Sequence, residues 1–161
     1  PPLVPSARQG YKMKNEDRNA FDRGERLEGG IHTAVNAWCE DRDAAKDQYG
    51  PIASWNTSEI TNMMYLFFDK AGFNEDISRW DVSNVTSLYY TFAYATSFNG
   101  DLSRWDVRQV TDMYSMFYDA TSFDQQLGGA WARSTADKDC MFHRSPGSIV
   151  GKTNDADGTP E

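Results

Sequence analysis

Four side chains of this sequence have the chemistry for metal binding or nucleophilic catalysis: His32, Cys39, Cys140 and His143. They form two pairs far apart in the chain, and they are the only histidines and cysteines among the 161 residues. Structural zinc sites take four such ligands, and neither pair supplies them. A nucleophile and its base would have to come from the residues of one pair. We therefore expect no metal, no cofactor and no catalytic residues, so the chain is interpreted as a non-enzyme.

Two motifs near the C-terminus are similar to ligand-binding loops but are incomplete. Residues 147–153 (Gly-Ser-Ile-Val-Gly-Lys-Thr) are one residue short of a phosphate-binding loop and lack its strand-to-helix context. Asp155, Asp157 and Gly158 are spaced as in a calcium loop, whose closing glutamate would fall beyond Glu161. Neither motif is expected to bind its ligand.

The composition excludes several classes of protein. The chain has 16 Lys and Arg residues and 24 Asp and Glu residues, which gives a net charge of −8. This charge argues against a nucleic-acid binder, which needs a basic face. A hydrophobic content of 39% is enough for one packed domain. No apolar run approaches the ~18 residues needed to span a bilayer, so we expect membrane association only through a partner.

Aromatic residues reveal an internal repeat. Segments 54–78, 79–103 and 104–128 align without gaps, and a further Trp, Trp131, lies 26 residues after Trp105. A unit of 25 residues cannot bury its apolar side chains alone, whereas stacked units can. The aromatic positions expected to form ladders through the stack are Trp55, Trp80, Trp105, Phe67, Phe92, Phe117, Phe73, Phe98 and Phe123.

These repeats predict a short right-handed solenoid of leucine-rich-repeat type, an α/β repeat with three 25-residue coils and a degraded fourth. A two-helix repeat would need ~33 residues or more. Each coil should contain one short strand, because the stretch after each Trp is β-branched. Stacked strands lie ~4.8 Å apart, which brings equivalent residues together.

The ends of such a stack need caps. Ile31, Ala34, Val35 and Trp38 have the spacing of one buried helix face. Cys39 and Cys140 fall in opposite caps, too far apart for a disulfide, and each is expected to be a buried thiol. The predicted organisation is an extended arm (1–30), a helical N-terminal cap (31–53), three repeats (54–128), a degenerate C-terminal cap repeat (129–149) and a polar tail (150–161).

Residues 80–86 (Trp-Asp-Val-Ser-Asn-Val-Thr) and 95–105 (Ala-Thr-Ser-Phe-Asn-Gly-Asp-Leu-Ser-Arg-Trp) resemble the BspA-type surface-protein repeat. This is a leucine-rich-repeat-like family of bacteria, protists and unicellular algae. Residues 34–39 and 49–55 are similar to the cap that precedes such repeats in algal members. The resemblance covers about residues 31–142. It implies an extracellular or organellar interaction module, often adhesive, without assigned catalytic residues.

Aromatic residues also fill positions outside the apolar ladder, which should face away from the core. They include six of the eight tyrosines. Two interpretations stay open: the rings pack over neighbouring coils or under the arm, or they form a partner-binding strip. These candidate protein-binding residues are Met64, Tyr65, Phe68, Tyr89, Tyr90, Tyr94, Tyr114 and Tyr118.

Two functions are consistent with these features. The first is a scaffold or accessory subunit docked on a larger assembly through the arm and the aromatic flank, because extended arms can wrap partners. If the algal resemblance holds, an organellar membrane complex, photosynthetic or respiratory, is one such assembly. The alternative is a secreted or surface adhesin for matrix protein or glycan, with glycosylation sequons at Asn56 and Asn84. An organellar or extracellular location is favoured over the cytosol.

Overall fold

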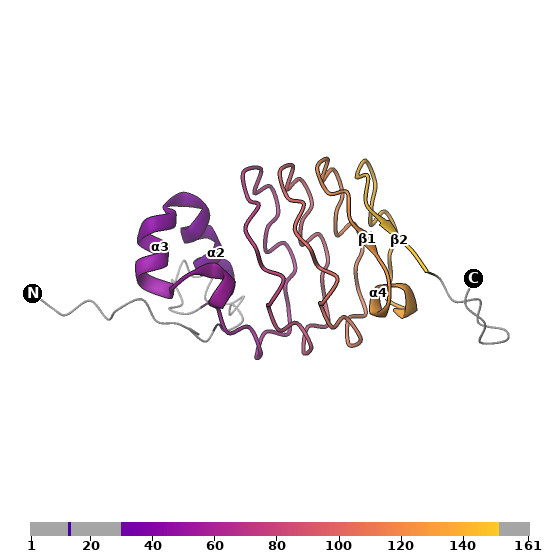
Figure 1. Ribbon diagram of the computed structural model, residues 1–161, viewed down its shortest axis with the longest axis horizontal. Coiled ribbons are helices and arrows are strands. Elements are labelled where there is room, and N and C mark those ends of the chain that lie inside the picture. The colour runs from indigo at the N-terminus through magenta and orange to yellow at the C-terminus, as the bar shows by residue number, and fades with distance from the viewer. Residues whose placement is uncertain (1–12, 14–29, 152–161) are drawn as a thin grey trace, which may run out of the picture.

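The structure is a computed structural model that describes residues 13 and 30–151 (Figure 1). The predicted arm and polar tail therefore lie almost wholly outside the described residues. The described fold is mostly irregular, with a few short helices, a two-stranded parallel sheet and a large buried aromatic cluster. Its elements are α2 (Ile31–Glu40), α3 (Arg42–Tyr49), the 3₁₀ helix η1 (Ile52–Ser54), β1 (Gln126–Leu127), α4 (Ala130–Arg133) and β2 (Ser148–Ile149).

Helices α2 and α3 cover the N-terminal end of the repeats (Figure 1). Helix α2 buries the face that its apolar spacing predicts, and Trp38 on that face meets Trp55 edge-on at 5.9 Å. Helix α3 begins after Asp41, whose carboxylate accepts the Ala44 N–H at 3.0 Å and so caps the first turn. It ends at Gly50, which adopts a φ of 78° that glycine tolerates best.

Met13 is a described residue of the predicted arm. Its side chain is fully buried in the core, and its backbone N–H donates to the Asn56 carbonyl at 2.9 Å. Met13 is thus a point at which the predicted arm packs on the first repeat.

Successive repeats lie side by side with equivalent residues adjacent (Figure 1). Parallel bridges join Asn62 to Ser87, Ser87 to Asp112, and Asp112 to Asp137. The Thr86 N–H donates to the Thr61 carbonyl at 2.8 Å. The prediction of one short strand in each repeat is wrong. The chain turns on both sides of each bridge, so a single residue of the repeat is paired there. Within the described residues the strands are β1 and β2, at another part of the repeat.

A zigzag of turns follows each bridge. Every second N–H donates to a carbonyl of the following repeat, and the N–H groups between them close turns within their own repeat, as Leu66 does to Met63 at 3.1 Å. The backbone hydrogen bonds across this part of the stack therefore all run from one repeat to the next, whereas the Thr91 hydroxyl donates back to the Met63 carbonyl at 2.9 Å. For the first pair of repeats they run from Met63 to Ser87, Tyr65 to Tyr89, Phe67 to Thr91 and Asp69 to Ala93, at 2.8 to 3.1 Å.

The zigzag needs two left-handed residues in every repeat. Their φ values of 51 to 59° recur at 25-residue intervals, and none of the residues is a glycine. The pattern continues into residues 129–149, so this segment keeps the backbone of a repeat although its apolar residues have diverged. The left-handed residues are Tyr65, Asp69, Tyr90, Tyr94, Ser115, Asp119, Cys140 and Arg144.

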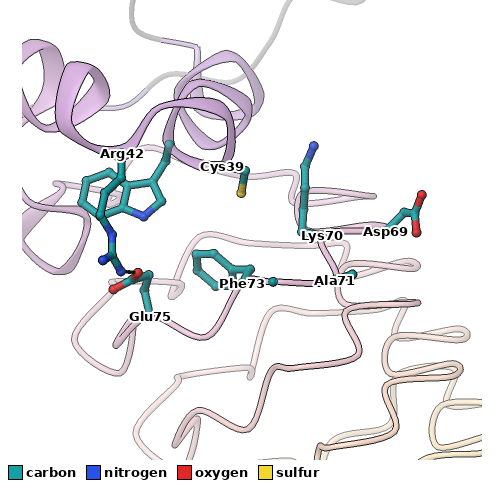
Figure 2. Close-up of a pocket in the computed structure, with 9 residues that line it drawn as sticks. Cys39, Arg42, Asp69, Lys70, Ala71, Phe73 and Glu75 are labelled. Carbon is teal, nitrogen blue, oxygen red and sulfur yellow. Dashed lines mark ion pairs between the residues drawn. The ribbon is translucent and has the colours of Figure 1, made fainter.

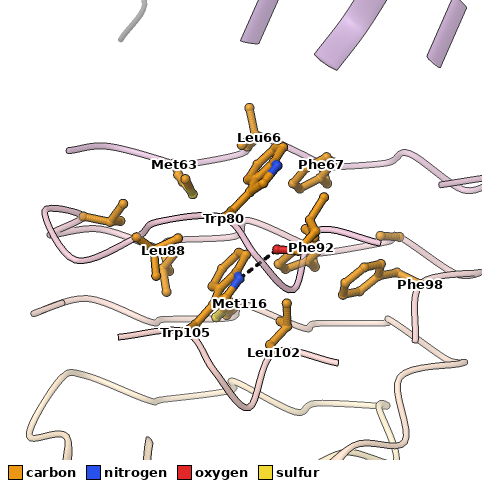
Figure 3. Close-up of a cluster of buried hydrophobic side chains, with 14 of the residues drawn as sticks. Met63, Leu66, Phe67, Trp80, Leu88, Phe92, Phe98, Leu102, Trp105 and Met116 are labelled. Atoms are coloured by element: carbon orange, nitrogen blue, oxygen red, sulfur yellow. Dashed lines mark hydrogen bonds between the residues drawn. The ribbon is translucent and has the colours of Figure 1, made fainter. Parts of the chain in front are cut away.

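The nine predicted ladder residues all lie in the buried core. Phe92 stacks between Phe67 at 5.0 Å and Phe117 at 5.5 Å, with ring planes within 9° (Figure 3). The indole N–H of Trp105, in the third repeat, donates to the carbonyl of Ile77 at the end of the first repeat at 3.1 Å. The rings thus run from repeat to repeat as one aromatic stack.

The predicted burial of the two thiols is wrong. Cys39 and Cys140 are free and exposed. Cys39 lies on the outer part of α2, beside exposed Glu40. Cys140 occupies one of the left-handed turn positions, where Tyr65 is also exposed.

Candidate functional site

The candidate protein-binding residues form one continuous aromatic surface, which we call the tyrosine strip: Met64, Tyr65, Phe68, Tyr89, Tyr90, Tyr94, Tyr114 and Tyr118. Tyr65 is 44%, Tyr94 39% and Phe68 36% exposed, and the other members are half-buried. Three of the members, Tyr65, Tyr90 and Tyr94, are left-handed turn residues, so the zigzag backbone places the strip. The structure brings together the residues that the repeat pattern singled out.

Ring contacts connect the strip along the stack. Tyr65 lies 5.5 Å from both Tyr89 and Tyr90, and Tyr89 stacks on Tyr114 at 5.5 Å. A second row runs from Phe68 to Tyr94 at 5.5 Å, and onward to Tyr118. Each ring is held by rings of the adjacent repeat, while three members keep large exposed surfaces. The strip is therefore both packed across repeats and open to solvent.

Met64 marks the N-terminal end of the strip. Its carbonyl accepts a hydrogen bond from His32 Nε2 of α2 at 2.7 Å. The other ring nitrogen of His32 is buried with no partner among the described residues. His32 thus caps a carbonyl of the first repeat and fixes α2 beside the strip.

Three phenols of the strip are shifted toward their neutral form. Burial raises the pKa of Tyr89 and of Tyr94, and the neighbouring Tyr90 raises the pKa of Tyr114. A neutral phenol is both an O–H donor and an acceptor. A surface of this kind offers rigid apolar area together with hydrogen-bonding groups.

His143 and Arg144 extend the surface beyond the predicted residues. The His143 ring stacks on Tyr118 at 4.6 Å, and Arg144 Nε lies 3.1 Å from the Asp119 carboxylate. His143 follows Tyr118 of the strip by 25 residues, and Arg144 follows Tyr94 of the strip by two repeats, or 50 residues. The 25-residue register could have identified them, because the degenerate repeat keeps that spacing although its residue types differ.

A separate cavity of about 580 Å³ lies between α2 and the turn at residues 69–75 (Figure 2). The Arg42 guanidinium lies 5.8 Å from the centre of the Trp38 ring and forms an ion pair with Glu75. Cys39 faces the same cavity, and burial raises the pKa of its thiol although nearby Lys70 opposes the change. An activated cysteine nucleophile needs a lowered pKa. The ion pair ties α3 to the first repeat, and the cavity lacks the electrostatics of a reactive thiol site.

Neither a metal-binding cluster nor a membrane-spanning helix is present in the described residues. Within residues 13 and 30–151, no three His, Cys, Asp or Glu side chains are grouped so that they could hold a metal ion. No helix in that part of the chain is long and apolar enough to span a membrane.

A family model matches most of the chain. The model of the family described as "Mycoplasma protein of unknown function, DUF285" matches residues 38–149, which include α3, the three repeats and the C-terminal cap repeat. No curated protein and no solved structure matches the chain. Because the match spans more than half of the sequence, the chain belongs to the DUF285 family.

Proposed function

We propose that this protein is a protein-interaction module, a scaffold or accessory subunit that docks on a larger assembly through the tyrosine strip. The observation behind the proposal is the contiguity of exposed Tyr65, Phe68 and Tyr94 with the half-buried rings beside them. Tyrosine supplies large contact area at low entropic cost, and contiguous exposed aromatic patches are typical of interaction sites. The ring-to-ring contacts preorganise the surface before a partner arrives.

The fold we propose for this role is a short right-handed solenoid of leucine-rich-repeat type, related to the BspA-type repeats. The 25-residue register of bridges, turns and stacked rings supports this assignment. A stack of repeats presents the same side-chain position once per repeat, so it builds an extended binding surface from a short unit.

The partner we propose is a protein in an organelle or at the cell surface, such as an organellar membrane complex. The arm (1–30) would add contacts beside the strip. Buried Met13 supports this role, because it places one point of the arm against the first repeat.

Aromatic substitutions on the strip test the docking proposal. We expect the variant Tyr65→Asn, Tyr94→Asn to lose a stoichiometric partner complex that the unchanged chain recovers from its native source. Asparagine tolerates the left-handed backbone at both positions, so the fold should survive. The exposed Arg104→Ala, outside the strip, is the control. Recovery of the same complex by the tyrosine variant, at an unchanged melting temperature, would contradict docking through the strip.

A surface adhesin remains the second candidate. The sequon residues Asn56 and Asn84 are exposed, so glycans there would not disturb the core. Exposed tyrosine rings also suit stacking on sugars. Glycan-array binding that is lost in the tyrosine variant would favour this function over an accessory subunit.

A further inference from the structure

The last repeat ends the stack with a row of backbone N–H groups. In the third repeat the N–H groups of Ser115 and Phe117 donate to the carbonyls of Asp139 and Met141 at 3.0 and 2.8 Å. The equivalent groups of the last repeat belong to Cys140, Phe142 and Arg144. Within the part of the chain that the structure describes, none of these three N–H groups has an acceptor.

This row, which we call the C-terminal edge (Cys140, Phe142 and Arg144), offers donors rather than acceptors. The Cys140 carbonyl already accepts the His143 N–H at 3.1 Å, and the Phe142 carbonyl accepts the Ser145 N–H at 3.0 Å. An ordinary β-sheet edge presents both kinds of group. The C-terminal edge therefore selects for a chain that brings carbonyl oxygens.

We propose that the C-terminal edge is a second docking surface, which binds an extended segment of a partner protein through its backbone carbonyls. The earlier repeats define the required occupant. Leu88, Tyr90 and Phe92 each donate to the third repeat, at carbonyls of every second residue. A partner segment with this spacing would continue the pattern in trans, as an added strand does at a sheet edge.

The side chains at the C-terminal end of the stack favour a partner segment that carries an apolar residue. Phe142 stacks on Phe117 at 5.5 Å with planes within 5°, and it is half-buried, whereas Phe92 between two rings is fully buried. A hollow of about 500 Å³ lies beside it. Met141 and Ile149 supply apolar lining there, and Lys138 contributes the positive end of the site. The partner segment would place an aromatic or aliphatic side chain in this hollow.

A second copy of this chain does not fit the edge. The carbonyls that it would have to present are those at the N-terminal end of its first repeat. There the Met64 carbonyl already accepts from His32 at 2.7 Å, and α2 covers this end. Two C-terminal edges facing each other would oppose N–H groups. The occupant is therefore a different protein.

None of the eight residues of the tyrosine strip belongs to the C-terminal edge, so each surface can fail without the other, although the Arg144 side chain borders both. The test uses the full ¹⁵N-labelled chain and a synthetic peptide that copies residues 104–128. This is the third repeat, whose backbone carbonyls accept the N–H groups of the second repeat. We expect the amide signals of Cys140, Phe142 and Arg144 to shift on titration, while those of Ser115 and Phe117 stay in place. Phe142→Ala should weaken peptide binding roughly tenfold. Arg104→Ala, exposed and outside both surfaces, is the control and should leave binding unchanged.

Three results would overturn the proposal. The first is no shift of the three edge amides at millimolar peptide. The second is an equal effect of a peptide with the same residues in scrambled order. The third is slow hydrogen exchange of these amides without peptide, comparable to that of Ser115, because the edge would then be covered within this chain. Retained slow exchange of Ser115 and Phe117 in Phe142→Ala would show that this variant is folded.

Discussion

Asp76 and Asp101 occupy equivalent turns of successive repeats, and each folds its carboxylate back on the chain. Asp76 accepts the Ser78 N–H at 3.0 Å and the Ser78 hydroxyl at 2.6 Å. Asp101 accepts the Ser103 N–H at 2.9 Å. These are Asx turns, in which a side-chain oxygen satisfies the backbone two residues on. Hydrogen bonds from Ser78 and Ser103 lower the pKa of Asp76 and Asp101, respectively.

These two carboxylates give a prediction for acid stability. A carboxyl whose pKa is lower in the folded than in the unfolded chain stabilises the fold above the unfolded value, near 4. This stabilisation is lost as the pH falls through the folded pKa. We expect the variant Asp76→Asn, Asp101→Asn to lose less stability between pH 5 and pH 2 than the unchanged chain, because asparagine keeps the acceptor oxygen but does not titrate. Urea unfolding across this range is the measurement, and parallel curves for the two proteins would contradict the prediction.

The corner of each repeat shows how local elements are joined. Asn99 Oδ1 accepts the Asp124 N–H and the Gln125 side-chain amide, both at 2.9 Å, and the Asn99 N–H donates to Asn74 Oδ1 at 3.0 Å. One asparagine in each of the first two repeats therefore bonds to the next corner. Side-chain amides here replace the strand pairing that each repeat lacks.

Removing this amide should weaken the contact between the second and third repeats. We expect Asn99→Ala to lower the free energy of unfolding by about 1 kcal/mol, since it leaves the Asp124 N–H without its acceptor. Asn84→Ala is the control, because Asn84 makes a single bond across repeats, to the Ser58 carbonyl at 2.7 Å, and is likewise exposed. Equal losses for the two variants in guanidinium unfolding would show that the corner has no special role.

The whole molecule depends on one aromatic stack whose middle and end differ in burial. Phe92 has rings on both sides, whereas Phe142 has Phe117 on one side and is half-buried. A side chain enclosed on both sides leaves a cavity when it is truncated, and the cost of that cavity adds to the lost burial. Stability should therefore be unevenly distributed along the stack.

Truncation at the two places tests this distribution. We expect Phe92→Ala to cost about 3 to 5 kcal/mol of unfolding free energy. Phe142→Ala should cost well under half as much, because part of the ring is already in contact with water. Thermal and urea unfolding of both variants measure the difference. A loss for Phe142→Ala as large as that for Phe92→Ala would mean that the last repeat is as tightly enclosed as the second.

The sequence by itself determined the repeat length, the ladder residues and the aromatic positions of the strip. Side chains spaced by 25 residues have equivalent surroundings only if the repeats stack in register, so periodicity specifies which rings meet. The buried face of α2 followed from the same kind of reasoning, through its apolar spacing.

The backbone of each repeat was decided by the tertiary structure. The β-branched stretch after each Trp predicted a strand, but the chain pairs there at a single residue and then turns. Tyr65, Ser115 and Cys140 are not residue types that favour the left-handed conformation of these turns, so local propensity did not indicate them. Hydrogen bonds to the following repeat hold Tyr65 and Ser115 there. The exposure of Cys140 and the open C-terminal edge follow from that geometry, because a group in the repeats is open or paired according to what the adjacent repeat presents, and this contact lies 25 residues away in the chain.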